Sequence, residues 1–595
     1  MPGPGPRNMD NSKPKDTKAV ILRLLTYVGK FKKNLFLTFF FVVLQTVCSL
    51  VASYMLRPLI NKYIIPGSGL EKLAGLAMGI GLMALVYVVQ IFSSYMQSRL
   101  MITVSQNSLE AIRNDLFEKV ERLPVRYFDR NATGDLMSRF TNDVDNIGMM
   151  LDNSMVSLIS GVLQLAGTLA MMIYTNIWLT LITVVMIPVF LKLATVIAGK
   201  SRSYYREQQK ALGALNGYIE EYVGGQKVVK VFNHEDTCEA QFGELNDELR
   251  RKQVGAQFFG GTMGPIMNNL GKLSYVFTAM IGGVLCALGR FDLGGLTIFV
   301  EYSRSFSFPV QNLASQVTTI FSALAGAERV FQMMDETPEN LHTEDPVSME
   351  NIDPHVELKH VTFGYNPDKV ILKDINVDAL SGKKIAFVGS TGAGKTTITN
   401  LLNRFYDIDQ GEILIDGTEI KQFDGEDLRR SIAMVLQDTH LFTGTVRDNI
   451  RYGRLDATDE EVEQAARTAS AHSFIMRLDK GYDPILEGDG ANLSQGQRQL
   501  LNIARAAISK APILVLDEAT SSVDTRTERH IEHGMERLMK NRTTFVIAHR
   551  LSTVRNADLI CVLEAGEIIE RGTHEELLAM KGRYYELYTG VKELD

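Results

Sequence analysis

Gly389-Ser390-Thr391-Gly392-Ala393-Gly394-Lys395-Thr396 is the stretch that decides the fold of this chain. Its spacing, G-x-x-x-x-G-K-[ST], is that of a loop that binds phosphate groups. An apolar run at 385–388 leads into it, and a helix-like run at 397–402 leaves it. Glycines let backbone N–H groups turn inward around phosphate oxygens, and a helix directs its positive end at the same anion. The sequence therefore predicts a strand, loop and helix that bind a nucleotide.

The side chains of this loop indicate which phosphates it contacts. Lys395 is placed to reach the β- and γ-phosphates, and the Thr396 hydroxyl is placed to bind Mg²⁺. A glycine-rich turn formed by chance would not bring strand, loop, Lys-Thr pair and helix together in this order. The predicted phosphate-binding residues are Gly389, Ser390, Thr391, Gly392, Ala393, Gly394, Lys395, Thr396 and Thr397.

Three further segments complete a nucleotide site. The apolar run 513–516 ends in Asp517 and Glu518, which suit a Mg²⁺ contact and a carboxylate that polarises the attacking water. An ordinary buried strand with an acidic end is the alternative, and the phosphate loop argues against it. Tyr365 follows a strand-like run and could stack on adenine. Residues 493–499 (LSQGQRQ) precede a helical run, so they could donate to a phosphate, including one bound to a partner chain.

Composition excludes several classes of protein. The chain has 595 residues, too many for one domain. Its net charge is −7, so no basic nucleic-acid surface is expected. The four cysteines form no C-x-x-C pair, which argues against a disulfide framework or a zinc site. Residues 1–18 are polar and rich in Pro and Gly, and we expect a disordered tail there, not a signal peptide.

The first half carries apolar runs that predict membrane spans. Residues 35–56 contain no charged side chain, and such a run crosses a hydrocarbon core of about 30 Å. A soluble helical protein would have to bury six runs of this kind. Residues 19–34 mix apolar with basic residues and predict an interfacial helix. The other five predicted spans are 73–96, 156–174, 179–197, 270–288 and 293–320.

The connections between spans predict their orientation. Lys and Arg crowd the N-terminal flank and the two long connections, so the positive-inside rule puts these and both termini in the cytoplasm. The long connections should continue the helices beyond the membrane. Breaks near 124–135 and 218–225 predict either short helices at cytoplasmic tips or solvated turns.

Few polar residues interrupt the spans. Glu301 and Arg304 stand three apart and could pair, and Pro309 could kink the last span. Such groups are candidates for a transport pathway, and helix–helix contacts are an equal alternative. The other polar positions are Asn268, Asn269, Lys272, Gln311, Asn312 and Gln316.

The LSQGQ run at 493–497 resembles the LSGGQ signature of ABC ATPases, and six spans before such a domain resemble a half-transporter of the ABC exporter family. The resemblance covers the chain after its tail. It implies an α-helical six-span transmembrane domain followed by an α/β P-loop (ABC-type) ATPase domain. The expected ranges are a tail at 1–18, the transmembrane domain at 19–334, a linker at 335–354 and the nucleotide-binding domain at 355–595.

The resemblance also implies roles for single residues. Tyr365 would stack on adenine, Gln437 would contact Mg²⁺ and sense the membrane domain, and His549 would lie near the γ-phosphate. Asp524 would belong to a loop that crosses the dimer interface. The signature residues Ser494, Gly496 and Gln497 would complete a partner's ATP site. Segments around 133–135 and 218–220 would be coupling helices, the second docking on the partner's ATPase domain.

Two departures from the family pattern bear on the partner. Gln495 replaces the first signature glycine, and Glu487-Gly488-Asp489-Gly490 stands where many relatives have Val-Gly-Glu-x-Gly. Glu518 and His549 are present, so this chain's own phosphate loop should form a competent site. The pattern is similar to the catalytically complete subunit of heterodimeric bacterial multidrug exporters. LSQGQ also occurs in homodimers, so a heterodimer is favoured and a homodimer stays open.

The expected function is ATP-driven export of amphipathic small molecules across the cytoplasmic membrane by alternating access. ATP and Mg²⁺ would be the cofactors, and the bilayer and a second half-transporter the partners. A lipid flippase or a peptide exporter of the same architecture is the alternative. An ABC-type channel or regulator fits less well.

Overall fold

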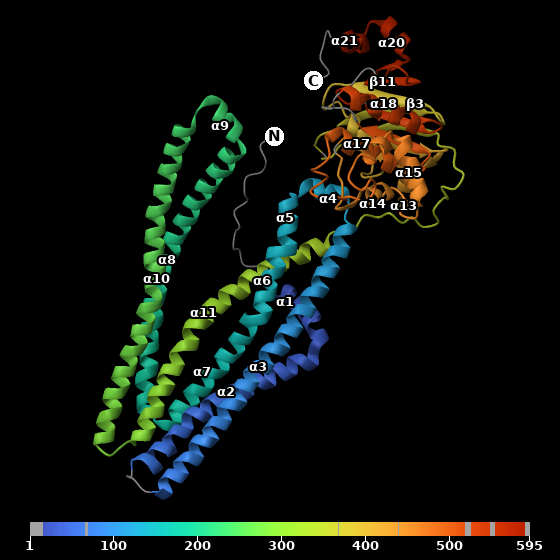
Figure 1. The fold of residues 1–595 in the computed structure, drawn as a ribbon. Coiled ribbons are helices and arrows are strands. Elements are labelled where there is room, and N and C mark those ends of the chain that lie inside the picture. Colours follow the sequence, from blue (N-terminus) through green and yellow to red (C-terminus); the bar gives the residue numbers. More distant parts are fainter. Residues whose placement is uncertain are drawn as a thin grey trace. The chain divides into compact units, whose positions relative to one another are not determined.

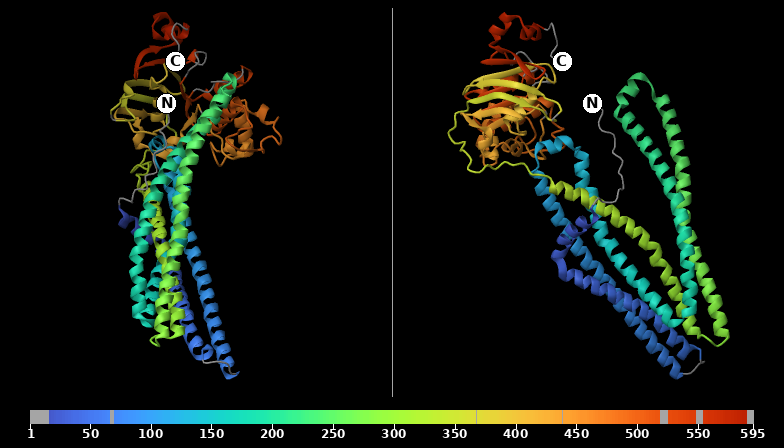
Figure 2. Two further views of the ribbon diagram at one scale, coloured as in Figure 1. Left: turned by 90° about the vertical axis from the view of Figure 1, so that its left-hand side faces the viewer. Right: turned by 180° about the vertical axis from the view of Figure 1, so that it is seen from behind.

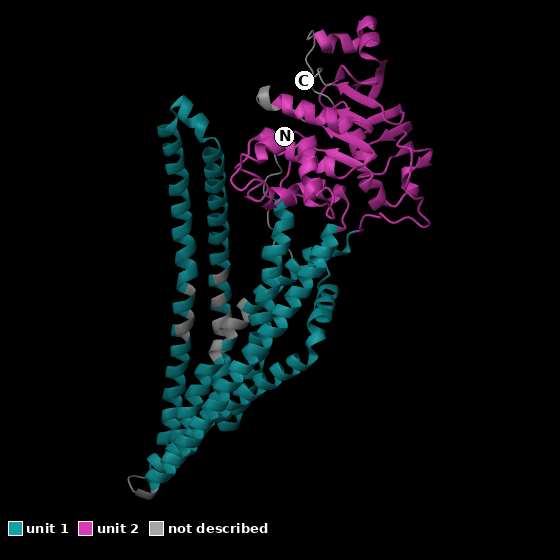
Figure 3. Ribbon diagram, turned by 45° about the vertical axis from the view of Figure 1, so that its right-hand side comes forward, with its two compact units in different colours: residues 1–121, 133–336 teal, residues 122–132, 337–595 magenta. Residues whose placement is uncertain are grey.

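The computed structural model describes residues 16–65, 70–366, 368–437, 439–517, 525–547 and 554–589. The chain forms two compact units, shown in Figure 3. The first comprises Met1–Glu121 and Thr133–Glu336, and the second comprises Arg122–Ala132 and Thr337–Asp595. The second unit therefore includes a short segment that the expected domain ranges assign to the transmembrane domain.

In the first unit the described residues form helices joined by short connections (Figure 1). Each of the six predicted spans falls within a helix. The elements of this unit are α1 (Thr17–Val28), η1 (Gly29–Phe31), α2 (Lys32–Leu59), η2 (Ile60–Ile64), α3 (Leu70–Glu121), α5 (Thr133–Ser138), η3 (Arg139–Asp143), α6 (Val144–Met149), η4 (Met150–Ser154), α7 (Met155–Thr175), α8 (Ile177–Gly224), α9 (Gln226–Phe232), α10 (Glu235–Ala287) and α11 (Leu293–Asp335).

Among the described residues, four helical stretches are long and apolar enough to cross a membrane: Thr17–Ile64, Lys72–Glu121, Thr133–Thr175 and Glu235–Ala287. The other two predicted spans lie on α8 and α11, where several side chains fall outside the description. α3 has 52 residues and α10 has 53. At a rise of 1.5 Å per residue each is roughly 80 Å long, far more than a bilayer of about 30 Å needs. The long connections thus continue the helices, as expected.

The two breaks lie at the predicted proline and glycines, but the short helix of the second connection lies on the other side of its break. α3 ends at Glu121, and Pro124, which lacks the N–H that a helix interior requires, is the N-cap of the next helix. The short helix after it is α4 (Val125–Arg130), in the second unit, and Thr133 already begins α5 of the first unit. In the second connection, residues 218–223 remain part of α8, and the separate short helix is α9. Gly225 separates α8 from α9, and Asn233 ends α9 in the left-handed conformation (φ 52°).

α8 and α10 run side by side and carry α9 at their joined end (Figures 1 and 2). α9 itself has no buried residue. Its apolar side chains Val228, Val231 and Phe232 are 61–73% exposed. This tip is therefore an apolar surface that the described part of the first unit leaves exposed.

Ion pairs hold the other helices of this unit together. The Arg329 guanidinium of α11 forms an ion pair with the buried carboxylate of Asp143, in which Nε donates to Oδ2 at 3.0 Å. At the opposite end of α11, Asp292 accepts from Arg57 Nη2 at 2.5 Å and from Asn61 Nδ2 at 2.5 Å. Both pairs join residues far apart in sequence, which no local pattern predicts.

The second unit contains a six-stranded sheet with the strand order β12-β11-β3-β10-β9-β6, a four-stranded sheet with the order β2-β1-β4-β5, and a small β7-β8 pair. One apolar core contains side chains of both larger sheets, such as Phe363 of the four-stranded and Phe387 of the six-stranded sheet. The other core joins the six-stranded sheet to the helices that pack on it. The strands are β1 (Val356–Phe363), β2 (Leu372–Ala379), β3 (Lys384–Gly389), β4 (Gln410–Ile415), β5 (Thr418–Glu419), β6 (Ile432–Val435), β7 (Gly444–Thr445), β8 (Ile485–Leu486), β9 (Ile513–Asp517), β10 (Thr543–Ile547), β11 (Leu559–Glu564) and β12 (Glu567–Gly572).

Helices and strands are interspersed along the rest of this unit (Figure 1). The described helices of this unit are α4 (Val125–Arg130), α12 (Lys395–Leu402), η5 (Ile420–Gln422), α13 (Gly425–Arg430), α14 (Val446–Arg451), α15 (Asp459–Thr468), α16 (His472–Ile475), α17 (Gln495–Ile508), α18 (Thr525–Met539), α20 (His574–Met580) and α21 (Arg583–Thr589).

The inner strands of the large sheet are parallel, and this decides where the site lies. β3 pairs with β10, β10 with β9 and β9 with β6, all in parallel. Their carboxyl ends therefore meet at one edge, where doubly wound sheets bind ligands. The phosphate loop follows β3 at this edge, and Asp517 ends β9 opposite Ile547 of β10.

Candidate functional site

The phosphate loop has the backbone that its glycines predict. Gly392 and Gly394 have φ of 81° and 104°, in the left-handed region that favours glycine. Gly394 is also the N-cap of α12 and has no side chain to accept from the first-turn N–H groups. Those donors and the positive end of the helix suit an anion. The loop is thus shaped for phosphate.

Lys395 is held inside this loop. Only 5% of the residue is exposed, and its Nζ donates to Gly389 O at 2.8 Å and to Ser390 O at 2.9 Å. A buried ammonium is costly unless it is hydrogen-bonded, and the loop carbonyls supply the bonds. The cation is therefore preorganised next to the place where phosphate oxygens would lie. Thr396, the next residue along α12, is exposed to solvent.

The sheet edge brings the other nucleotide residues toward the loop. β10 separates β3 from β9, so Asp517 lies about two strand spacings, roughly 10 Å, from the end of β3. Asp517 is 5% exposed. Gln437 comes two residues after β6, at the same edge. The roles predicted for Glu518, Asp524 and His549 fall on residues outside the described part of the chain, although β10 ends only two residues before His549.

The residues at this edge fit a magnesium ion held together with a nucleotide. No cluster of three His, Cys, Asp or Glu side chains suitable for a metal occurs among the described residues. Mg²⁺ bound with a nucleotide needs only one or two carboxylates besides phosphate oxygens and water. Thr396 and Asp517 supply one hydroxyl and one carboxylate of that kind.

The signature segment leads into a helix, as predicted, but the helix begins within the segment. α17 starts at Gln495, whereas the sequence predicted that the helix would start after residue 499. Ser494 is its N-cap: Ser494 Oγ accepts from Gln497 N at 3.3 Å, and Gln497 Oε1 accepts from Ser494 N at 2.9 Å. This reciprocal pair is a capping box, which the sequence S-x-x-Q signals. Both signature side chains therefore stabilise the helix end in this chain.

Two residues that sequence reasoning missed join α17 to the loop of Gln437. Asn502 Nδ2 donates to Leu436 O at 3.2 Å, and Gln499 Oε1 accepts from Thr439 Oγ1 at 2.6 Å. Both side chains are about 5% exposed. Buried amides on an otherwise apolar helix face were the available signal, because a buried amide needs partners. The signature helix and the Gln437 loop are thus one connected structure.

Tyr365 stands beside the phosphate loop. Its hydroxyl donates to Thr397 Oγ1 at 3.3 Å and accepts from Asn400 Nδ2 at 3.1 Å, both on α12. Its ring meets that of Tyr406 edge-on, with centroids 4.9 Å apart. The structure brings Tyr365 and the loop together, as predicted. Its stacking on adenine stays a prediction.

Tyr406 lies between Tyr365 and α4. The sequence predicted neither a role for Tyr406 nor a contact of α4 with this part of the second unit. The Tyr406 hydroxyl donates to the Asp129 carboxylate. The Arg126 guanidinium lies 5.7 Å from the centre of the Tyr406 ring. Burial, followed by the bond to Asp129, raises the pKa of Tyr406 above its ordinary value, so the hydroxyl remains a donor. Helix α4 thereby contacts Tyr406, Tyr406 contacts Tyr365, and Tyr365 is hydrogen-bonded to α12, the helix that follows the phosphate loop.

The first unit has a polar cavity of about 260 Å³ among its helices. The described residues that line it carry mainly amides and hydroxyls, and none of them is charged. Gln45 Oε1 and Gln90 Oε1 are buried there without a hydrogen-bond partner in the described part of the structure. The lining residues are Gln45, Thr46, Ser49, Gln90, Ser157, Ser160, Gly161, Gln164, Pro309 and Gln316.

The cavity changes the reading of the polar residues predicted within the spans. Pro309 and Gln316 lie at the cavity. Glu301 and Arg304 are both exposed and, within the described residues, do not pair with each other. The side chains of Gln311 and Asn312 fall outside the description.

Comparison with known proteins decides the family. A model of the ABC transporter transmembrane region matches residues 35–310, and the ABC transporter model matches residues 372–521. The chain is 44% identical to the ABC transporter ATP-binding protein YfiC of Bacillus subtilis over 97% of its length and 95% of the relative. This chain belongs to the ABC transporter family.

Other relatives differ in what their names say they move. A fatty acid ABC transporter ATP-binding/permease protein of Mycobacterium bovis is 41% identical over 88% of this chain and 83% of that protein. An ATP-dependent lipid A-core flippase of Syntrophus aciditrophicus is 36% identical over 91% and 90% of the two chains. The solved structure of a bacterial Atm1-family ABC exporter with ATP bound has a TM-score of 0.76 at 27% identity, covering 94% and 98% of the two chains.

These findings place the chain as an ABC half-transporter. A helical transmembrane domain is fused to an ABC ATPase domain that binds ATP and couples its hydrolysis to transport. A half-transporter implies a second half, so the working unit is a dimer. The protein is a multi-pass membrane protein.

Proposed function

We propose that this ABC half-transporter exports amphipathic small molecules across the cytoplasmic membrane by alternating access. The observation that carries the proposal is the uncharged polar cavity inside an apolar helical unit. Polar groups within spans mark substrate pathways, and here they are amides and hydroxyls. Such a lining suits molecules with an apolar body and one or two hydrogen-bonding groups.

The ATP site of the proposal is shared between two chains. Lys395 and the loop N–H groups hold the phosphates, Tyr365 supports the adenine, and Thr396 and Asp517 hold Mg²⁺. The bound ion supplies neutralisation of phosphate charge. Glu518 polarises the attacking water, with Gln437 and His549 beside it. The partner's signature helix closes the site with its N-terminus, to which Ser494, Gly496 and Gln497 belong in this chain.

ATP binding and substrate binding act on one equilibrium in this proposal. Closure of the shared site favours the outward-facing state, and hydrolysis resets it, with Asp524 at the interface between the domains. Because both ligands bias the same two states, each must alter the affinity for the other equally. α9 supplies a surface for the second chain, since its apolar side chains are uncovered in the first unit.

The second chain of this proposal is a different half-transporter, with a homodimer as the alternative. Gln495 in the signature and Glu487 to Gly490 depart from the family pattern, whereas Glu518 and His549 are retained. Such a division suits a pair in which only one ATP site hydrolyses efficiently. In this proposal both termini are cytoplasmic, which the basic flanks of the spans support.

A lipid flippase is the second candidate function. The names of two relatives, one for fatty acid and one for lipid A-core, favour it. A lipid has the same amphipathic character as the molecules proposed above, so the cavity accepts either. A peptide exporter and a channel share the architecture, and no observation favours them.

The test is an ATPase measurement on the chain reconstituted in vesicles, with and without a partner half-transporter encoded beside it. Amphipathic drugs, fatty acids, phospholipids and short peptides are compared as stimulants, and uptake of labelled stimulant is measured in inverted vesicles. We expect drug stimulation and ATP-dependent uptake, both reduced by Gln45→Leu and Gln90→Leu but not by Gln253→Leu on the exposed face of α10.

The outcomes separate the candidates. Stimulation by phospholipid alone would replace drug export by lipid flipping, and passive conductance without ATP would indicate a channel. Full activity of the chain without a partner would show a homodimer. Equal activity of both cavity variants and the wild type would remove the cavity from the pathway.

A further inference from the structure

The cavity between α1 and the helical bundle has a different character from the polar one. It encloses about 240 Å³ and is lined almost wholly by apolar side chains. The helices α1, α2, α3, α7 and α11 contribute to it, together with η4; Leu24, Val42, Met101, Leu151, Ile159 and Leu324 represent them. The volume is below the roughly 300–1,000 Å³ that sites for drug-sized molecules have.

The lining offers no polar group to orient a drug. Of the lining residues that the structure describes, Thr38 alone has a hydroxyl, and it donates to Asn34 O at 2.8 Å in its own helix. Such a site can bind a ligand by van der Waals contact and by exclusion of water. A flexible hydrocarbon chain, which needs neither hydrogen bonds nor a broad pocket, fits these conditions.

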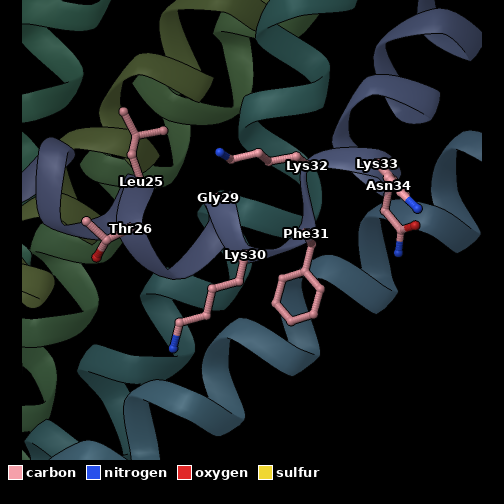
Figure 4. A pocket seen from close by; sticks show the side chains of 8 residues that line it. All are labelled: Leu25, Thr26, Gly29, Lys30, Phe31, Lys32, Lys33 and Asn34. Atoms are coloured by element: carbon pink, nitrogen blue, oxygen red, sulfur yellow. The ribbon is translucent and has the colours of Figure 1, made fainter.

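A basic turn lies at the mouth of this cavity. Leu25 lines both the apolar cavity and an open hollow formed by the turn between α1 and α2. Figure 4 shows Lys30 and Lys32 on either side of Gly29, and Lys33 on the far side of Phe31. The Lys30 ammonium lies 5.5 Å from the centre of the Tyr27 ring.

These lysines have no carboxylate to neutralise them within the described residues. Arg23, the nearby arginine of α1, is different because it pairs with Asp335 at 2.6 Å. Three exposed ammonium groups beside an apolar cavity form a site for an amphiphile with a negative head. Surface lysines attract anionic lipid headgroups by about 1 kcal/mol each, which is about fivefold in affinity.

The position of the site in the fold identifies the membrane leaflet. α1 packs against the last turns of α11, where Tyr27 and Phe331 stack at 6.3 Å. α11 leads from the membrane to the ATPase domain, so the cavity lies at that end of the bundle. The lipids of the leaflet on the ATPase side are therefore the ones within reach.

We infer that the cavity beneath α1 holds part of one acyl chain of an anionic phospholipid, whose headgroup rests on Lys30, Lys32 and Lys33. The lipid fixes α1 against α2, α7 and α11. This is a structural lipid site, separate from the polar cavity proposed for transported molecules. Its occupancy does not depend on what the protein exports.

The experiment uses the purified full chain, assembled as it is extracted, with an equimolar mixture of dioleoyl phosphatidylglycerol and dioleoyl phosphatidylcholine. Native mass spectrometry counts the lipids retained per chain. We expect retention of one phosphatidylglycerol, with a preference over phosphatidylcholine of about tenfold or more. Lys30→Gln, Lys32→Gln and Lys33→Gln together should abolish the preference.

Filling the cavity provides the second arm. Ile159 is 37% exposed and lines the cavity, so Ile159→Trp should exclude both lipids. Val162→Trp, one turn further along α7 and 51% exposed, is the matched control and should retain lipid as the wild type does. Lys62→Gln is the control for charge, because the Lys62 ammonium lies 5.6 Å from the Tyr63 ring in an arrangement like that of Lys30.

Three results would overturn the inference. These are equal retention of the two phospholipids by the wild type, retention of phosphatidylglycerol by Ile159→Trp, and displacement of the phospholipid by equimolar free oleate. Should Ile159→Trp fail to fold, the surface lysine variants still decide the headgroup preference. Because lipid retention is measured in place of transport, failure here leaves the proposed export function untouched.

Discussion

Lys395 shows how the chain prepares its nucleotide site. Its ammonium is buried and bonded to carbonyls of the loop that it serves. ATP phosphates would replace these carbonyls as partners, so binding exchanges one set of bonds for a charge-assisted one. The phosphate loop is thus formed before the ligand arrives.

At the same scale, Gly389 is fixed by a close backbone contact. A Cβ built on Gly389 would lie 2.2 Å from Leu563 O of the neighbouring strand. We predict that Gly389→Ala lowers the melting temperature of the ATPase domain by several degrees and weakens ATP binding at least about tenfold, because neither strand can give way. Calorimetry and nucleotide titration measure both effects.

The matched control is Gly417→Ala. Gly417 has a φ of 74° and no neighbour within 4 Å of its added Cβ. Gly417→Ala introduces the backbone strain without the clash, so it should lower the free energy of unfolding by only about 1 kcal/mol. Equal effects at the two positions would show that the contact with β11 is not what requires glycine.

Glu518 is the residue on which hydrolysis depends in our proposal. Glu518→Gln keeps the shape of the side chain but removes the carboxylate that polarises water. We expect ATP binding to remain and the ATPase rate to fall about 100-fold or more. Nucleotide binding and phosphate release are measured on the reconstituted dimer.

Glu532→Gln on α18 is the control for this change and should behave as the wild type. A Glu518→Gln protein with normal turnover would exclude Glu518 as the polarising carboxylate.

At the scale of elements, α4 is the part of the second unit that comes from far away in sequence. Tyr406 bonds Asp129 of α4, and Arg429 pairs with Glu339 at 2.5 Å just after the last long helix. Glu339 N also donates to Arg122 O at 2.8 Å. The two segments by which the chain enters the second unit, near Arg122 and near Glu339, are therefore bonded to each other and to the rest of that unit.

We predict that Tyr406→Phe uncouples transport from ATP hydrolysis. The variant keeps the aromatic ring beside Tyr365 but loses the hydrogen bond to Asp129, a bond to a charged group worth about 1.5–3 kcal/mol. Basal ATPase should persist, while stimulation by transported compounds should fall several-fold. ATPase assays with and without stimulant measure the difference.

Tyr452→Phe serves as the control, since Tyr452 is 57% exposed and lies away from α4. Unchanged stimulation in Tyr406→Phe would mean that α4 signals through other contacts.

The elements also show what could be predicted from sequence. β1 and β3 lie where alternation and the phosphate-loop pattern predicted strands, because local periodicity and glycine geometry decide such segments. The six spans likewise fall within helices. The second tip helix, α9, was misplaced by several residues, because glycine marks where a helix breaks but not which side of the break forms the tip. The bond between Tyr406 and Asp129 joins residues 277 positions apart, and no local pattern encodes it.

At the scale of the whole molecule, the hairpin of α8 and α10 is the feature that requires a partner. Val231 and Phe232 at its tip are 73% and 66% exposed. We predict that Val231→Asp with Phe232→Asp lowers the fraction of dimer at least about tenfold, because two charges would have to be buried. Native mass spectrometry of the extracted protein measures that fraction.

Val254→Asp on α10 is the control, as this residue is 63% exposed and away from the tip. A stable dimer carrying both α9 substitutions would show that assembly relies on other surfaces.

The insertion of α4 in the second unit has a consequence for the timing of synthesis. About 200 residues separate this segment from the rest of its unit, which a ribosome adds in roughly 10–40 s. Through that interval Arg126 and Asp129 are exposed while the later membrane helices are inserted. The contact between α4 and Tyr406 can therefore form only after the ribosome has added all the helices of the membrane half.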